Sequence, residues 1–338
     1  MPTVQTDFGL ALTSDDATPI IPFLTAANSG LTLESINYTG SLDALRLVET
    51  GTQISGPNGG FTIPPGVFLT SGGVPPTTNT ETGYTVSHST PGDPDLDASA
   101  SQAFSGAGNT QDAAIVEFTF DTPAPGSLGF QVAFGSDEFP EFSDSSYVDI
   151  AAVYVNGVNH ALFNGDPAQP LSVIDTNLSL GNFIDNTSGE YGTEYDGFAP
   201  SLVVFAPVVA GTNTVKIAIA DTGDTALDSG LFISNLNLNS TGASGTFVPV
   251  QGSNDPDNIV GSDAPEAFSL GDGNDSVAPG LGTDSIDIGG GANTIIGTLA
   301  DLNGDVVVNF GEDDKLTYEG AFFTTGGSEK PRALSVLG

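Results

Sequence analysis

The chain has 338 residues, enough for two domains with a substantial core, and its 42 acidic residues against 5 Lys and Arg give a formal net charge of −37. This charge excludes a surface that binds nucleic acid or anionic lipid, because both need basic patches that neutralise phosphate. A hydrophobic share of 38% argues against a disordered acidic chain, and the absence of cysteine excludes disulfides and thiolate metal sites.

The N-terminal segment Met1–Phe8 lacks the basic and apolar regions of a secretory signal peptide. No stretch of the sequence approaches the roughly 20 consecutive apolar residues that span a bilayer. We therefore expect no membrane span, and an export signal that lies elsewhere or has been removed. A short helix is expected only at Pro22–Asn28.

Strand patterns dominate residues 1–245. Ala113–Phe120 alternates, so that Val116, Phe118 and Phe120 share one face. Further apolar or alternating runs are Leu128–Phe134, Tyr147–Val155, Leu202–Phe205, Thr214–Ala220 and Leu231–Leu238. Clusters of Gly, Pro, Asn and Asp separate these runs. The pattern predicts an antiparallel β-sandwich of jelly-roll kind, with the polar segment Asn239–Gly245 as the joint to the C-terminal region.

Two acidic segments of this region are candidate metal ligands. The first supplies Asp137, Glu138 and Glu141 after one strand and Asp149 one strand later; the second supplies Asp221, Asp224 and Asp228. If the two loops meet at one end of the sandwich, their carboxylates form an oxygen site fit for calcium. The alternative is a solvated acidic rim.

A third acidic segment is Asp93-Pro-Asp95-Leu-Asp97. Extended backbone would place its three carboxylates on one face, where they could bind calcium. The segment lacks the later Gly and Glu of an EF-hand loop, so a solvated acidic stretch is the competing interpretation.

The order of motifs in the sandwich region resembles the Choice-of-anchor L domain of bacterial surface and secreted proteins. The motifs are Gly66–Gly72, Gly92–Asp97, Ile115–Phe120, Phe134–Phe142, Val155–Val158, Tyr195–Phe198, Ile217–Asp224 and Asp228–Gly230. Members of the family carry varied attachment devices at the C-terminus. The resemblance implies a surface or extracellular location rather than a particular activity.

Catalytic signatures are absent from the sequence. Asp221-Thr-Gly and Asp228-Ser-Gly resemble the paired signature of aspartic proteases, but seven residues cannot supply the two lobes that such an enzyme needs. His88 and His160 are the only histidines, and neither a paired-histidine zinc motif nor a G-x-S-x-G nucleophile elbow is present. We therefore expect a non-enzymatic protein.

The stretch Gly252–Ile296 repeats with a step of nine residues. An oxygen-bearing side chain recurs at Asp257, Glu266, Asp275, Asp284 and Asn293, and an apolar residue follows two positions later each time. This is the nonapeptide pattern of a parallel β-roll, the RTX type of calcium repeat. The turn residues Asp255 and Asp272 are further candidate calcium ligands. The alternative is a Gly/Asp-rich linker with accidental spacing.

Two nine-residue units make one coil of such a roll. Asp257, Asp275 and Asn293 should therefore line one edge, and Glu266 and Asp284 the other. Stacked carboxylates repel one another, so the roll should fold only when calcium is present. Glu266 and Asn293 depart from Asp, and Pro256 and Pro265 replace smaller residues, which limits the expected number of good sites to two or three.

Residues 301–338 should close the roll. Asp305–Phe310 is expected to form one more strand, Gly311–Tyr318 resembles the closing turn after RTX rolls, and Thr324–Gly338 is either part of an export signal or a docking segment. The RTX resemblance implies type I secretion, which reads an uncleaved C-terminus.

The sequence thus predicts an all-β chain: a sandwich over residues 1–245, a short parallel β-roll over 246–300 and a capping strand and tail over 301–338. The predicted function is that of a secreted, calcium-binding surface, adhesive or matrix protein. Its expected partners are calcium ions and either further copies of itself, in filaments or layers, or other surface components. A secreted hydrolase or a carbohydrate-binding protein is the alternative.

Overall fold

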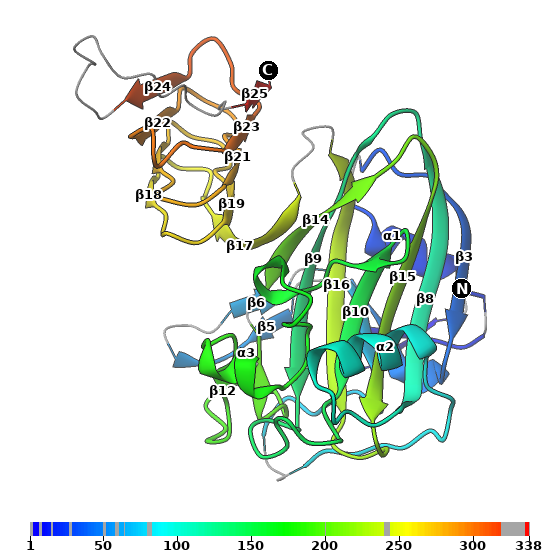
Figure 1. The fold of residues 1–338 in the computed structure, drawn as a ribbon. Coiled ribbons are helices and arrows are strands. Elements are labelled where there is room, and N and C mark those ends of the chain that lie inside the picture. The colour runs from blue at the N-terminus through cyan, green and yellow to red at the C-terminus, as the bar shows by residue number, and fades with distance from the viewer. Residues whose placement is uncertain are drawn as a thin grey trace. The chain divides into compact units, whose positions relative to one another are not determined.

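The computed structural model describes residues 3–6, 9–14, 16–26, 29–49, 52–57, 61–63, 65–79, 83–199, 201–239, 244–318 and 335–337. The chain divides into two compact units, one made of residues 1–240 and 244–246 and the other of 241–243 and 247–338. The first is built on antiparallel sheets and the second is a parallel β-solenoid, which confirms the predicted fold class (Figure 1). No helix in these ranges has the length and apolar character needed to cross a membrane.

Two antiparallel sheets form the first unit. In spatial order, the first sheet contains β1 (Thr3–Thr6), β2 (Gly9–Leu12), β4 (Leu45–Val48), β7 (Gly66–Thr70), β16 (Ser229–Asn239), β9 (Gly126–Ser136) and β14 (Leu202–Val208), with β13 (Gly197–Phe198) and β12 (Ile184–Asp185) added beside the end of β9. The second contains β11 (Val158–Asn159), β10 (Ile150–Val155), β15 (Gly211–Thr222), β8 (Thr110–Thr122) and β3 (Leu33–Thr39). A separate hairpin joins β5 (Thr52–Ile54) and β6 (Phe61–Ile63).

The main core lies between the two sheets and follows the alternation of the strands. Val116, Phe118 and Phe120 of β8 are buried in it, as predicted, together with side chains such as Leu69 and Phe130 of the first sheet. The opposite face of β8 contributes to a smaller apolar cluster with the helix α2. Both faces of the second sheet therefore have apolar cover along part of their length.

The helices differ from the prediction. A 3₁₀ turn, η1 (Thr18–Ile20), leads into α1 (Ile21–Leu24), which overlaps the predicted helix at Pro22–Asn28; positions 27 and 28 of that prediction lie outside the described residues. Two further helices, α2 (Pro94–Ala103) and α3 (Asp175–Ser179), were not predicted.

The expectation of extended backbone at Asp93–Asp97 is wrong, because α2 begins there. Asp93 caps this helix: its Oδ1 accepts hydrogen bonds of 3.1 Å from the amides of Asp95 and Leu96. Pro94 occupies the first turn, where its fixed φ favours a helix and its missing N–H is not needed. Leu96 and Ala100, four residues apart, are buried against the second sheet, which holds the helix in place (Figure 1).

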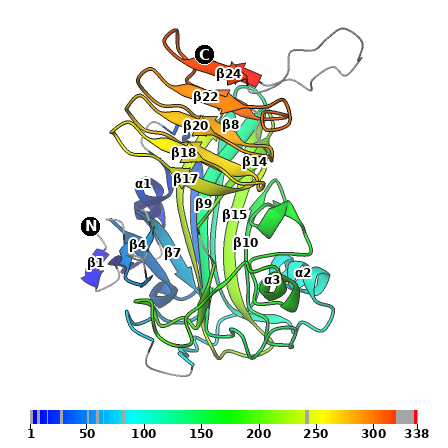
Figure 2. The same ribbon diagram turned by 90° about the vertical axis from the view of Figure 1, so that its left-hand side faces the viewer.

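The second unit is a stack of coils with two parallel sheets (Figure 2). One sheet contains β18 (Asn258–Val260), β20 (Ser276–Ala278), β22 (Thr294–Gly297) and β24 (Lys315–Tyr318). The other contains β17 (Gly245–Gln251), β19 (Glu266–Ser269), β21 (Ser285–Asp287), β23 (Val306–Val308) and β25 (Ser335–Leu337). Ile259 pairs with Val277 and Val277 with Ile295, so one coil takes 18 residues, as the nonapeptide pattern predicted.

The regular step ends after Ile295. Ile295 pairs with Leu316 and Ile286 pairs with Val307, so each of these coils takes 21 residues instead of 18. The three extra residues lie within the turn Thr298–Gly304, in which Leu302 is buried. Asp305–Phe310 contains the predicted strand as β23, whereas Gly311–Tyr318 ends in a further rung, β24, rather than only a closing turn.

Several sequence predictions fall on parts of the chain that are not described. Of the tail Thr324–Gly338, only the backbone of β25 is described, and it adds a strand beside β23. Of the joint Asn239–Gly245, positions 240–243 are not described. The boundaries of the three predicted regions stay predictions.

Candidate cation sites

Carboxylate groups stack along both edges of the roll. On one edge, the amides of Asp257, Asp275 and Asn293 donate to the side-chain Oδ1 of the next coil, at Asp275, Asn293 and Asp314, over 2.8–2.9 Å. The other edge repeats this arrangement: the Glu266 amide donates to Asp284 Oδ1 over 2.8 Å, and the Asp284 amide to Asp305 Oδ1 over 2.9 Å. The two predicted columns are therefore present, each extended by one residue that the sequence pattern missed.

These amide bonds use only one oxygen of each carboxylate. The other oxygen, Oδ2, is buried without a hydrogen-bond partner at Asp275, Asp284 and Asp305. The exposed fractions of the three residues are 2%, 1% and 0%. Burial raises the pKa of Asp284 to about 8, against the opposing hydrogen bond from Glu266, and raises that of Asp305 to about 6. Free, hard oxygens of this kind are what calcium binds.

The carboxylates of the first two rungs of the roll differ from these three because serine residues donate hydrogen bonds to them. Asp257 Oδ2 accepts hydrogen bonds from Ser253, at 2.6 Å from the amide and 2.9 Å from the hydroxyl. Glu266 accepts 2.8 Å from the Ser262 amide in the same way and also bonds the Ser262 hydroxyl. These carboxylates find protein partners within their own turn. The roll thus contains two serine-capped rungs and three carboxylates with a free oxygen.

Glycine is required where the later turns stack. Gly271 has φ = +85°, and a Cβ there would lie 2.1 Å from the carbonyl oxygen of Ser253 in the preceding coil. Gly280 repeats this with φ = +90° and the carbonyl of Ser262 at 2.1 Å. No other residue fits both the backbone angle and the close approach. Asp255 and Asp272 lie exposed in these turns.

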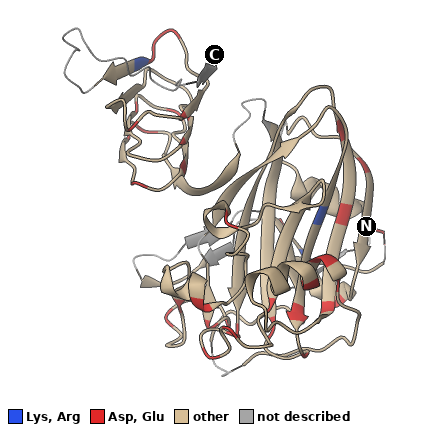
Figure 3. Ribbon diagram, viewed as in Figure 1, with Lys and Arg blue, Asp and Glu red and all other residues tan. Residues whose placement is uncertain are grey.

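In the first unit, the two acidic loops named by the sequence do meet. Ser136 at the end of β9 pairs with Ser229 at the start of β16, and the Asp137 amide donates to the Asp228 carbonyl over 3.3 Å. Asp149 immediately precedes β10 and Asp221 lies near the end of β15, at the same end of the sandwich. Figure 3 shows the acidic residues gathered at the ends of these strands.

Asp137 and Asp228 are bound by backbone amides. Asp137 accepts from the amides of Tyr84 (3.1 Å) and Asp196 (3.2 Å), and Asp228 accepts from those of Gly73 (2.8 Å) and Val86 (3.0 Å). These two carboxylates hold the long connection after β7 in place.

Asp149 links the two sheets. Its Oδ1 accepts 3.0 Å from the Thr222 amide of the second sheet, and its Oδ2 lies 2.7 Å from the hydroxyl oxygen of Ser229 in the first. Ser229 Oγ in turn lies 2.8 Å from Ser136 Oγ. Burial, and then the charges of Asp221 and Glu138, raise the pKa of Asp149 well above its ordinary value.

Glu138 and Asp221 have no such partners. They are 1% and 0% exposed, and neither Glu138 Oε2 nor either carboxylate oxygen of Asp221 makes a hydrogen bond. Burial and then the charges of Asp224 and Asp221 raise the pKa of Glu138 to about 9. Burial likewise raises the pKa of Asp221 to about 8; the nearby Ser71 hydroxyl lowers it but has no hydrogen-bond geometry to this carboxylate.

The remaining predicted ligands are either exposed or paired. Glu141 is exposed, and the half-buried Asp224 accepts 3.1 Å from the Ala226 amide. Lys216 Nζ lies 2.5 Å from Asp93 Oδ2 and 2.8 Å from Asp95 Oδ2.

Asp97 is also bound by the protein. Its Oδ1 accepts from the amide (2.6 Å) and the hydroxyl (2.7 Å) of Thr110. The carboxylates of residues 93–97 therefore cap the start of α2 and attach this helix to the second sheet.

Within the described ranges, no three His, Asp or Glu side chains are arranged so that they could hold a metal ion as they stand. The candidate sites therefore consist of buried oxygens without partners: the free oxygens of the roll and the pair Glu138–Asp221.

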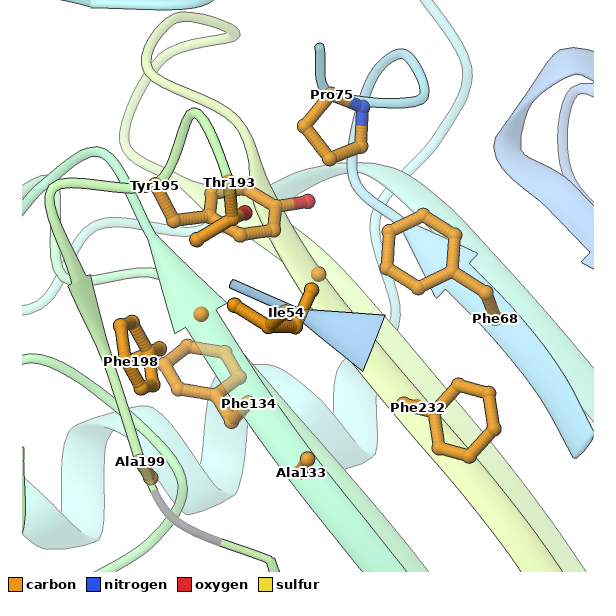
Figure 4. Close-up of a pocket in the computed structure, with 12 residues that line it drawn as sticks. Ile54, Phe68, Pro75, Ala133, Phe134, Thr193, Tyr195, Phe198, Ala199 and Phe232 are labelled. Atoms are coloured by element: carbon orange, nitrogen blue, oxygen red, sulfur yellow. The ribbon is translucent and has the colours of Figure 1, made fainter. Parts of the chain in front are cut away.

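Two hollows of the first unit have a different character. A cavity of about 50 Å³ lies among Phe68, Phe134, Tyr195 and Phe232, and it is too small for a ligand larger than a few waters (Figure 4). A wider hollow of about 450 Å³ lies over the second sheet and is lined by polar side chains that include Asn37, Glu117 and Lys216, beside Tyr154.

Comparison with solved structures gives only distant likenesses. A family 35 carbohydrate binding module from an environmental isolate is 15% identical, with 40% of this chain covering 79% of that one at a TM-score of 0.19. A catalytic domain of a GH87 alpha-1,3-glucanase in complex with nigerose is 13% identical, and the GH87 catalytic unit from Streptomyces thermodiastaticus 12%, with TM-scores of 0.20 and 0.18. For both glucanases, 74% of this chain covers 51% of the other chain. TM-scores this low carry no argument about function.

Comparison with curated proteins gives no match. The Choice-of-anchor L domain family matches residues 25–239, which is more than half of the chain and nearly all of the sandwich. The chain belongs to the Choice-of-anchor L domain family.

Proposed function

We propose that this protein is a calcium-stabilised, non-enzymatic building block of a cell surface or extracellular matrix. Membership of the Choice-of-anchor L family implies a surface or extracellular protein. The observation that supports the calcium role is the set of buried, unpartnered oxygens of Asp275, Asp284 and Asp305 in a roll whose turns are built from glycine.

Repulsion between stacked carboxylates favours calcium binding by the roll. Neighbouring strands of a sheet lie about 4.8 Å apart, so carboxylates on successive coils are close like charges. Glu266, Asp284 and Asp305 form one such column, and the charges of Asp305 and Glu266 contribute to the raised pKa of Asp284. A divalent cation bound to the free oxygens neutralises the column, and this binding energy becomes folding energy of the roll.

The roll has little else to stabilise it. Each rung contributes about one apolar side chain, such as Phe268, Val277 or Ile286, to a narrow core. The sequence has no cysteine to cross-link the coils. Bound calcium takes the place of a larger core, and it ties the stability of this unit to the calcium-rich conditions outside the cell.

Calcium titration by calorimetry tests the proposal. The wild-type chain is compared with the triple variant Asp275→Asn, Asp284→Asn and Asp305→Asn, and with a control of equal charge change, Asp263→Asn, Asp313→Asn and Asp121→Asn, at exposed positions. We expect the first triple variant to lose most of the binding heat and the control to retain it. Equal binding by all three proteins would contradict the proposal.

Self-association of copies into filaments or layers is part of the same proposal. The roll exposes apolar side chains of one parallel sheet, namely Val260 of β18 and Leu316 and Tyr318 of β24, with exposed fractions of 75%, 44% and 38%. Calcium also lowers the repulsion between chains of net charge −37. Light scattering should show particle growth when calcium is added and its reversal by chelator; a monomer at millimolar calcium would count against assembly.

Glycan binding is a second candidate function, supported by the polar hollow over the second sheet. Asn37, Glu117 and Lys216 lie side by side on β3, β8 and β15, because Glu117 pairs with both of its neighbours in register. Hydroxyls of a sugar can bond to such side chains. A glycan array with wild type and Glu117→Ala tests it: binding that the variant loses supports this function, and an array without signal opposes it.

A further inference from the structure

We propose that the sandwich binds a calcium ion of its own between Glu138 and Asp221, independently of the roll. Glu138 lies in the loop after β9 of the first sheet, Asp221 lies near the end of β15 in the second sheet, and the charge of Asp221 acts on Glu138. It extends the proposed calcium dependence to the Choice-of-anchor L unit itself.

Both side chains are buried and lack partners. Glu138 is 1% and Asp221 0% exposed, yet three of their four carboxylate oxygens are enclosed without a hydrogen bond. Buried polar groups are almost always paired in folded proteins, and an exception of this kind points to an ion or a proton that belongs there.

The acids around this pair are treated differently by the fold. Asp137 and Asp228 bind two backbone amides each, and Asp149 is satisfied by the Thr222 amide and the Ser229 hydroxyl. The loops thus provide hydrogen-bond donors to these three buried carboxylates but none to the free oxygens of Glu138 and Asp221. Hydrogen bonds from the protein therefore do not offset the negative charge of these two side chains.

The charge around the pair also favours a cation. The charges acting on the two carboxyl groups come from acids, namely Asp112, Asp137, Asp224 and Asp228. Lys216, which forms the ion pairs of the described part of the chain, is engaged with Asp93 and Asp95 instead. Two carboxylates carry two negative charges, which a divalent cation balances.

Calcium fits such a site better than smaller or softer ions. The donors are hard carboxylate oxygens, and the sequence has no cysteine to supply a thiolate. Calcium accepts six to eight oxygens in flexible geometry, so water and backbone carbonyls can complete the shell around two carboxylates. Asp224 is half-buried, and its charge acts on Glu138.

The competing explanation is that Glu138 and Asp221 are simply protonated. Protonated side chains need no metal, so the two explanations differ in the number of ions that the chain binds. They also differ in response to amide substitution, since Gln and Asn reproduce the shape of a protonated carboxyl group but do not bind calcium well.

Equilibrium dialysis of the full chain against calcium, with metal counted by mass spectrometry, separates them. The test variant is Glu138→Gln/Asp221→Asn, and the matched control is Glu190→Gln/Asp121→Asn, which changes the same residue types at exposed positions. We expect the test variant to bind one calcium fewer per chain than wild type, and the control to bind as many as wild type.

An unchanged count in Glu138→Gln/Asp221→Asn would overturn the proposal in favour of protonation, and an equal loss in the control would overturn it in favour of diffuse surface binding. Circular dichroism in chelator checks that the test variant folds. If it does not fold, Glu138→Gln alone is used, and we expect its sandwich site to bind calcium at least tenfold more weakly than that of wild type. Unchanged calcium affinity in that single variant would contradict the proposal. The roll variant Asp275→Asn/Asp284→Asn/Asp305→Asn keeps the sandwich ion, so failure of one site is distinguishable from failure of the other.

Discussion

Asp284→Asn should change the stability of the roll in opposite directions with and without calcium. The asparagine side chain keeps an oxygen for the 2.8 Å hydrogen bond from the Glu266 amide, and it removes a buried ionisable carboxyl group. Burial raises the pKa of Asp284 to about 8 from 3.8. Native Asp284 is therefore held protonated at pH 7, although the unfolded chain would ionise it.

The magnitude can be worked out from that shift. Keeping a group protonated about three units above its ordinary pKa costs about 4 kcal/mol, and screening at the edge of a thin roll leaves about half. In chelator we therefore expect Asp284→Asn to stabilise the roll by about 2 kcal/mol. With free calcium at about a thousand times its Kd, a bound ion contributes about 4 kcal/mol to wild type, so the variant becomes the less stable protein by about 2 kcal/mol.

Hydrogen exchange followed by mass spectrometry measures both cases on peptides from residues 266–308, because exchange of protected amides reports local opening. A difference of about 2 kcal/mol corresponds to about a 30-fold change in exchange rate, slower for the variant in chelator and faster in calcium. The same sign in both conditions would refute the assignment of Asp284 as a calcium ligand.

Three further outcomes are expected. Gly271→Ala should lower the free energy of unfolding of the roll in urea by more than about 2 kcal/mol, because the new Cβ would lie 2.1 Å from the Ser253 carbonyl oxygen. Gly157→Ala is the control: its φ is also positive, at +81°, but it has open space around it, so the substitution should cost only about 1 kcal/mol. Ser262→Ala removes the hydrogen bond from the Ser262 hydroxyl to Glu266, so it should lose about 1 kcal/mol of protection in the first coil whether or not calcium is present; a calcium-dependent loss would show that Glu266 also binds the ion. In chelator, the stability of the sandwich should fall as pH rises from about 4 to about 8. Burial raises the pKa of Asp221 to about 8, so over this range the native state holds a proton that the unfolded state has released. A stability that rises over this range would contradict the burial of Asp221.

The roll was the most predictable part of the molecule, because its signal is periodic. A nine-residue step fixes at once the turn, the inward apolar side chain and the column of carboxylates, and the register Ile259–Val277–Ile295 is its direct consequence. The step also has a limit. The three extra residues in the turn before Gly304 shift the phase, so Asp305 and Asp314 fell outside the pattern although they continue the two columns.

The start of α2 shows how one short motif supports two structures. Asp93-Pro-Asp-Leu-Asp97 can be an extended acidic face or a helix N-terminus with an Asp cap and a proline in the first turn. The signal that favours the helix is the apolar pair Leu96 and Ala100, four residues apart.

The sandwich site could be located from sequence only in outline. The two acidic loops were identified as candidates, and the fold brings them together. Which carboxylates stay free was not predictable, because it depends on groups from distant segments: Tyr84 and Gly73 satisfy Asp137 and Asp228, and Ser229 satisfies Asp149. These partners lie 53, 155 and 80 positions away along the chain, and no local pattern reports such contacts.

The most direct test of the central claim is a crystal structure grown in calcium, with anomalous scattering used to place the metal. We expect anomalous peaks within ligand distance, about 2.3–2.6 Å, of the free Oδ2 atoms of Asp275, Asp284 and Asp305. A well-ordered roll in which these three oxygens have no metal beside them, in calcium-saturated crystals, would contradict the account.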